Sequence, residues 1–267
     1  MGAILKAGAA IALGFLIALG GGLTWSVLLG LNLSINPALP WSVVAATLLL
    51  TLAWLYLSGL GWPRSTQSAR RASLPQKQLS IGEWVAASAA AVGASGFALC
   101  ALLLAFRLLP IPITPLPDFA TREPVMALAY FGAAALVAGV VEEAAFRGYM
   151  LSGVERAWGR LAAYIVVAVA FSILHAGNPE FLYLLPLYFC LSLTLSGVVT
   201  MSGSVWPGVV AHTLSDLVSF ALLLFVGPSV LAAPLSVAAP DLDAMVLTAC
   251  AAGLGILSLA GFIAMRR

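Results

Sequence analysis

Residues 125–150, VMALAYFGAAALVAGVVEEAAFRGYM, decide how this chain folds and where its chemistry lies. The stretch is long and apolar enough to cross a membrane as one helix, since a span needs about 20 mostly apolar residues. Two adjacent acids and an arginine nevertheless stand near its end, at Glu142, Glu143 and Arg147. Each charge at such a depth costs roughly 2.5–3.5 kcal/mol on insertion scales unless it is paired or faces water. Three charges within six residues therefore need a specific reason.

Helical spacing separates the roles of the two acids. Glu143 and Arg147 stand at positions i and i+4, acid before base, which is the favourable order for a pair on one helix face. Glu142 is turned away from that face by about 100°. The spacing predicts that Glu143 pairs with Arg147 and that Glu142 has no such partner. Desolvation makes a lone carboxylate more basic, as a general base working near neutral pH requires.

The composition of the whole chain identifies a polytopic membrane protein. The 267 residues are 62% hydrophobic and only 8% charged, against about 25% charged residues in a soluble globular protein. The net charge of +2 is small, and membrane topology explains the basic residues better than nucleic-acid binding does. Cys100, Cys190 and Cys250 all lie in apolar stretches without a CxxC spacing, so we interpret them as small core residues.

Hydropathy and proline or glycine clusters predict an all-α, polytopic helix bundle of about eight transmembrane spans. We expect a single transmembrane domain over residues 1–267. Proline-rich stretches at 110–117 and 228–240 form loops between spans. The eight expected spans are 8–30, 41–61, 83–109, 125–150, 161–177, 182–201, 206–226 and 244–264.

Basic residues predict the orientation in the membrane. The segment 63–80 holds Arg64, Arg70, Arg71 and Lys77 and no acid, so the positive-inside rule makes it cytoplasmic. Eight alternating spans then place both termini in the cytoplasm, together with ten of the twelve lysines and arginines. The first apolar run is too long for a usual signal peptide, and we interpret it as a retained span. Spans rich in Ala, Gly and Leu suggest a prokaryotic plasma membrane.

Few other strongly polar side chains lie within the spans. The only two histidines are His175, four residues after Phe171, and His212, four residues before Asp216. His212 and Asp216 therefore share a helix face. Glu142 and His175 would lie at equal depth on antiparallel helices if the intervening turn centres near residues 158–159.

The depth of His212 leaves two arrangements open. It lies only about six residues, roughly 9 Å, from the start of its span, whereas Glu142 is about 24 Å of helix from the turn at 158–159. Either the hairpin at 158–159 projects into the cytoplasm, or the turn before residue 206 re-enters the membrane.

The polar residues of these spans support two mechanisms. In one, Glu142 and His175 polarise a water that attacks a carbonyl, and His212, oriented by Asp216, stabilises the oxyanion. In the other, the same groups bind a metal such as zinc, although no helix offers two histidine ligands at the usual spacing. The plainest alternative is that each polar residue only holds helices together.

Three motifs in order resemble the CPBP family, which comprises the CAAX proteases and bacteriocin-processing membrane proteins and includes the Ras-converting endopeptidase. They are EExxxR at 142–147, FxxxH at 171–175 and HxxxD at 212–216, and the flanks FRG at 146–148 and GSVWP at 203–207 also match. The resemblance covers about residues 125–220 and implies that these are the catalytic core spans, with a buried polar catalytic cavity among them.

The resemblance implies an intramembrane glutamic endopeptidase, which would cleave near the end of a membrane-associated protein or peptide in the lipid bilayer. Because no helix offers two metal ligands at the usual spacing, we expect it to need no metal or cofactor. Glu142 would be the base with His175, while His212 and residue 216, often Asn in the family, would form the oxyanion site. Glu143 and Arg147 would shape the helix and the cavity. A non-proteolytic scaffold of the same family and a proton-coupled transporter remain the competing functions.

Overall fold

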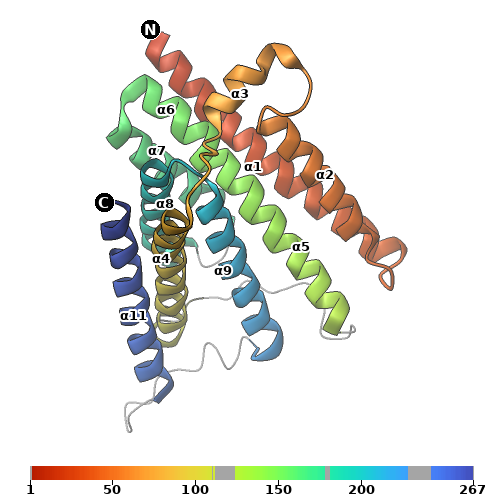
Figure 1. The fold of residues 1–267 in the computed structure, drawn as a ribbon. Coiled ribbons are helices and arrows are strands. Elements are labelled where there is room, and N and C mark those ends of the chain that lie inside the picture. Colours follow the sequence, from red (N-terminus) through yellow and green to blue (C-terminus); the bar gives the residue numbers. More distant parts are fainter. Residues whose placement is uncertain (1, 110, 112–123, 178–180, 228–241, 267) are drawn as a thin grey trace.

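A computed structural model describes residues 2–109, 111, 124–177, 181–227 and 242–266 (Figure 1). The described chain is built from helices, connected by short turns. Their bounds are α1 Gly2–Ile35, α2 Trp41–Leu57, η1 Arg64–Thr66, α3 Gln67–Ser73, α4 Ile81–Leu108, α5 Pro124–Glu142, η2 Glu143–Met150, α6 Leu151–Trp158, α7 Arg160–Leu174, α8 Phe181–Ser202, α9 Trp206–Phe225 and α11 Leu242–Met265. The predicted loops at 110–117 and 228–240 lie outside the described residues apart from Ile111, as does Arg122.

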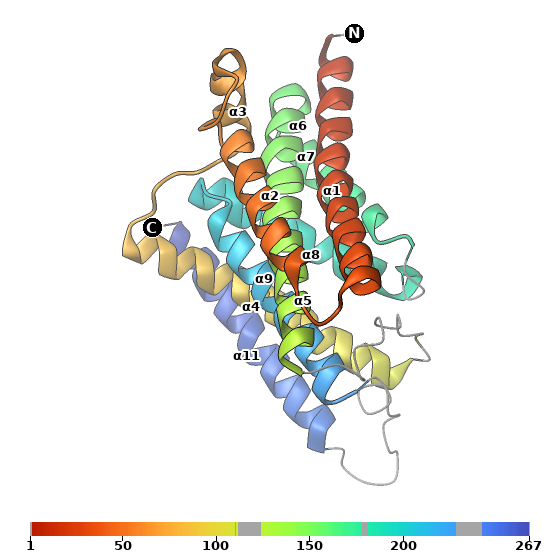
Figure 2. The same ribbon diagram turned by 90° about the vertical axis from the view of Figure 1, so that its right-hand side faces the viewer.

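The helices confirm the predicted fold class of a polytopic all-α membrane protein. Six helical segments are long and apolar enough to cross a membrane, and α2 and α7 are shorter apolar helices. These eight segments correspond to the eight expected spans. The start of α1 and the end of α11 point toward the same end of the bundle (Figures 1 and 2), as an even number of crossings requires.

Two helices run well past the spans expected from hydropathy. The first helix covers Gly2–Ile35 rather than 8–30, and the fourth runs without interruption over Val125–Trp158 rather than ending at residue 150. Hydropathy reports the apolar part of a helix. Its hydrogen-bonded end is set by capping and turn residues instead. Gly159, with φ of 84°, ends α6 and begins α7, which confirms the predicted turn at 158–159.

Small residues bring α4 and α11 into close contact along their lengths. A side chain added at Gly93 would lie 2.6 Å from the backbone nitrogen of Ser258, and Ser258 Oγ donates a hydrogen bond of 2.9 Å to the Ala90 carbonyl. Such contacts drive association in lipid, where burying apolar surface between helices gains little. They fix one side of the bundle.

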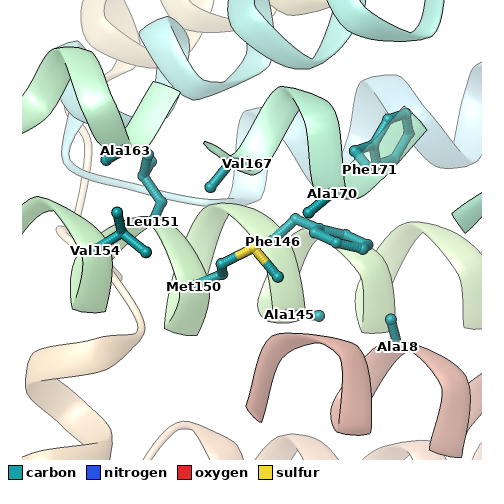
Figure 3. Close-up of a cluster of buried hydrophobic side chains, with 10 residues drawn as sticks. All are labelled: Ala18, Ala145, Phe146, Met150, Leu151, Val154, Ala163, Val167, Ala170 and Phe171. Atoms are coloured by element: carbon teal, nitrogen blue, oxygen red, sulfur yellow. The ribbon is translucent and has the colours of Figure 1, made fainter. Parts of the chain in front are cut away.

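The core next to the charged motif is apolar and aromatic. Figure 3 shows Phe146 and Met150 of η2 between Ala18 of α1 and the α7 residues Val167 and Ala170, all buried. This packing holds η2 between two neighbouring helices.

The basic segment 63–80, from which the orientation in the membrane was predicted, also packs against the bundle. Lys77 donates its backbone N–H to the Gly203 carbonyl, and Val205 donates to the Pro75 carbonyl, both at 3.0 Å. Leu74 is buried, and a side chain at Gly148 would lie 2.6 Å from its Cδ1. The segment therefore connects η2 to the turn that begins α9.

The prediction that all three cysteines are core residues was wrong for two of them. Cys100 is buried, but Cys190 and Cys250 are exposed on the outer surface of the helices. A membrane helix is apolar on its lipid-facing side as well as its packed side, so an apolar neighbourhood in sequence does not locate the core.

Candidate active site

Glu143 and Arg147 of the charged motif lie in a π-helix, which the sequence did not predict, and Glu142 is the last residue of α5. Residues Glu143–Met150 form η2 between the α-helical segments α5 and α6, and all eight of its residues are buried. π-helical turns inside longer helices occur frequently at functional sites. The added width of the turn still leaves Glu143 and Arg147 in contact, since Arg147 Nη1 donates to Glu143 Oε1 at 2.8 Å. Their predicted pairing is confirmed.

Glu143 has a second partner on another helix. Its Oε1 also accepts a hydrogen bond of 3.0 Å from Nδ1 of His212 on α9. Glu143 and Arg147 are completely buried, so the ion pair lies in a medium where charge interactions are strong. Glu143 thus links the motif on η2 to the histidine on α9 and holds one imidazole nitrogen in place.

A glycine on α9 makes this link possible. Gly208 stands one helical turn before His212, and a side chain there would lie 2.8 Å from Oε2 of Glu143. That distance is shorter than real Cβ contacts, so a larger residue would displace the Glu143 carboxylate, which Arg147 and His212 hold through Oε1. In the sequence, the GSVWP motif at 203–207 directly precedes this glycine.

The other nitrogen of His212 faces two more carboxylates. Nε2 lies 4.0 Å from Oε2 of Glu142 and 3.7 Å from Oδ2 of Asp216. Asp216 therefore shares a face with His212, as its spacing predicts. Glu143 holds Nδ1 through a hydrogen bond, and Asp216 faces Nε2 on the other side of the ring. That Asp216 orients His212 stays a prediction.

Glu142 differs from Glu143 in its partners. Oε2 of Glu142 is buried and has no hydrogen-bond partner among the residues that the structure describes. Its side chain retains 18% of its exposure, against none for Glu143. A desolvated carboxylate that lacks a hydrogen-bond partner at one oxygen, on a side chain that is still partly exposed, is suited to accept a proton from a reacting group.

Phe171 is the packing centre of the site. Its ring lies 5.0 Å from that of His175 and 6.2 Å from that of His212, measured between centroids, and Arg147 Cζ lies 4.3 Å above it. A desolvated cation over an aromatic ring gains about 2 kcal/mol. Phe171, which the sequence places one helical turn before His175, therefore contacts both histidines and the buried arginine, and we assign it a supporting role.

His175 is held by its own helix and by a residue that the sequence did not single out. Its Nδ1 lies 2.9 Å from the Phe171 carbonyl, which can only accept, so Nδ1 carries the proton. The ring also stacks on Tyr188 of α8, with centroids 4.2 Å apart and planes 19° apart. No motif or spacing points to Tyr188, because its contact is made between two helices.

The site contains two acids on neighbouring positions with opposite environments, two histidines and a third carboxylate. Among the described residues, no three His, Cys, Asp or Glu side chains are arranged as ligands of a metal ion. The groups present can transfer protons and stabilise charge. Metal-independent chemistry remains a prediction.

The fold and the site together define a class of protein. It is a membrane-spanning helical bundle with an acid–histidine site buried among its helices. Residues 124–218 match the family model of the type II CAAX prenyl endopeptidases, described as Rce1-like. The chain carries a domain of this family there, and all seven residues predicted for the site lie within it. No curated protein matches the chain, and neither does any solved structure.

Proposed function

We propose that this protein is an intramembrane endopeptidase that uses a water activated by Glu142 and His175 to cleave near the end of a membrane-associated protein or peptide. The family match supports a membrane-bound protease acting within the bilayer. The catalytic core is proposed to be residues 125–220 of a single transmembrane domain. The observation that carries the mechanism is the facing pair of Glu142 Oε2 and His212 Nε2, 4.0 Å apart.

In the first proposed step, Glu142 takes a proton from water while the oxygen attacks the scissile carbonyl carbon. His175 is proposed to support this base by polarising the same water. The carbonyl oxygen becomes an oxyanion while the C–N bond is still intact. Glu142 then returns the proton to the leaving amine when that bond breaks, so charge and protons balance.

His212 is proposed to stabilise the oxyanion. Because Nδ1–H is committed to Glu143, the ring can donate from Nε2 only as the protonated imidazolium. The carboxylates of Glu142, Glu143 and Asp216 lie around the ring as possible counter-ions of this form. Glu143 therefore acts in this proposal as a positioning residue as well as a structural one.

The experiment is cleavage by purified protein in lipid nanodiscs, with a prenylated CAAX peptide as the first probe and the released C-terminal peptide measured by mass spectrometry. Replacing Glu142 by Gln should lower the rate about 10²–10⁴-fold, the usual contribution of a general base. Glu155→Gln is the matched control, because Glu155 pairs with Arg160 outside the site. An unchanged rate in Glu142→Gln would refute the assignment.

A prokaryotic plasma membrane with both termini in the cytoplasm belongs to the same proposal. The basic segment 63–80 and the common end of the first and last helices support it. Labelling of single cysteines introduced at Ser65 and at Lys6 with a membrane-impermeant maleimide should require opening of the cells. Labelling of intact cells at both positions would reverse the orientation.

A further inference from the structure

We propose that a cavity at one end of the bundle binds the headgroup of an anionic phospholipid. The cavity, about 470 Å³ in volume, lies between α1, α3, η2 and α6 and is lined in part by Lys6, Ser73, Tyr149 and Arg156. It is separate from the candidate active site, since it shares no residue with the acid–histidine cluster. The inference does not depend on the proposed proteolysis.

The cations that line the cavity have no acidic partner. Arg156 donates Nη1 to the Ala72 carbonyl at 3.1 Å and Nη2 to Ser73 Oγ at 3.5 Å, and both acceptors are neutral. Lys6 is exposed and forms no ion pair with any residue that the structure describes. No acidic residue lines the cavity. Its positive charge is therefore left for a ligand.

A neighbouring arginine on the same hairpin provides a contrast. Arg160, four residues beyond Arg156, donates Nε to Glu155 Oε1 at 2.8 Å. The hairpin thus neutralises the cation that faces away from the cavity and leaves the one that lines it uncompensated. This distribution favours an anion at Arg156.

The walls of the cavity change from polar to apolar along α1. Ala9 and Leu13 line it below Lys6, and Leu13 lies seven residues, roughly 10 Å, further along the helix. Leu13 is 40% exposed, so the apolar end opens to the outer surface of the bundle. A ligand with a phosphate at one end and an acyl chain at the other fits this gradient, whereas free phosphate uses only the polar end.

The position of the cavity agrees with such a ligand. The start of α1, α3 and the end of α6 lie at the same end of the molecule (Figures 1 and 2). This is the end that the basic residues predict to face the cytoplasmic leaflet. Basic pockets between transmembrane helices on that side bind anionic lipid headgroups, with about 1 kcal/mol of attraction for each Lys or Arg near the surface.

The test is native mass spectrometry of the full chain in detergent, titrated with dioleoyl phosphatidylglycerol. One tightly bound lipid is expected. Lys6→Gln and Arg156→Gln should each weaken its binding about fivefold, the equivalent of one surface charge. Dioleoyl phosphatidylcholine should bind the unaltered protein no more tightly than phosphatidylglycerol binds the double variant Lys6→Gln with Arg156→Gln. Lys6→Gln keeps the test valid if Arg156→Gln unfolds, because Lys6 holds no other residue in place.

Arg64→Gln is the matched control, because Arg64 is exposed at the same end but does not line the cavity. It removes the same charge and should leave binding unchanged. The proposal fails if Arg64→Gln weakens binding as much as Lys6→Gln does, which would indicate a general surface attraction. It also fails if phosphatidylcholine binds equally well, or if inorganic phosphate at the lipid's concentration displaces phosphatidylglycerol.

Discussion

Replacing Glu143 by Gln should damage stability and activity through two different contacts. The substitution keeps the shape of the side chain and removes its charge. In the native structure Oε1 accepts from both Arg147 and His212, and neither Glu143 nor Arg147 has any exposed side-chain surface. The variant therefore leaves a buried guanidinium without its counter-ion.

The expected magnitudes follow from these contacts. Breaking a buried ion pair by removing one partner costs about 3–5 kcal/mol. The cation–π contact of Arg147 with Phe171 and the remaining amide oxygen favour the lower end of this range. Losing a charge-assisted hydrogen bond to His212 is worth about 1.5–3 kcal/mol, or roughly 10–100-fold in cleavage rate if its geometry is used in the transition state.

The double variant Glu143→Gln with Arg147→Met separates the two effects. Removing both charges should recover most of the lost stability, since buried pairs replaced by apolar groups are often neutral. Activity should stay low, because His212 still lacks its carboxylate. Unfolding would be followed by circular dichroism in mixed micelles and activity by cleavage at a temperature where every variant is folded. Wild-type activity in the stable double variant would show that Glu143 does not position His212.

Three further outcomes are expected. Gly208→Ala should lower the free energy of unfolding by about 1–3 kcal/mol through overpacking against Glu143, and it should slow cleavage at least tenfold. Gly132→Ala is the control and should change neither quantity, because nothing lies within 4 Å of the added methyl group. A thermal melt and a rate for each variant check this, and equal behaviour would contradict it. In single-turnover assays, Asp216→Asn should retain most of the cleavage rate, while Asp216→Ala should be about tenfold slower. The reason is that only the amide can still form a hydrogen bond near Nε2 of His212. Equal rates in the two variants would leave Asp216 without a polar role. Prolonged treatment with EDTA and 1,10-phenanthroline should leave activity intact, whereas loss on chelation and return with stoichiometric zinc would establish the metal mechanism.

Contacts within one helix could be predicted from the sequence. Glu143 and Arg147, and likewise His212 and Asp216, lie close because residues four apart share a face whatever the helix packs against. The turn at Gly159 and the all-helical membrane fold follow in the same way, from a local turn residue and from hydropathy. These features need no knowledge of how the helices are arranged.

The relative heights of the helices were decided by the tertiary structure. Glu142 and His212 lie 4.0 Å apart although one is about 24 Å and the other about 9 Å from the nearest helix end. The hairpin between α6 and α7 therefore projects beyond the start of α9, as Figures 1 and 2 show. Both arrangements that the sequence left open share this offset, because each places the hairpin beyond the start of α9.

Contacts between helices were also decided only by the tertiary structure. The bond from His212 to Glu143, the stacking of Tyr188 on His175 and the close approach at Gly208 depend on how helices are rotated about their axes. Membrane helices are apolar on every side, so the hydrophobic pattern that reports rotation in soluble proteins is absent. The sequence by itself thus determined which residues share a helix face, and the packing of small residues between helices determined which faces meet.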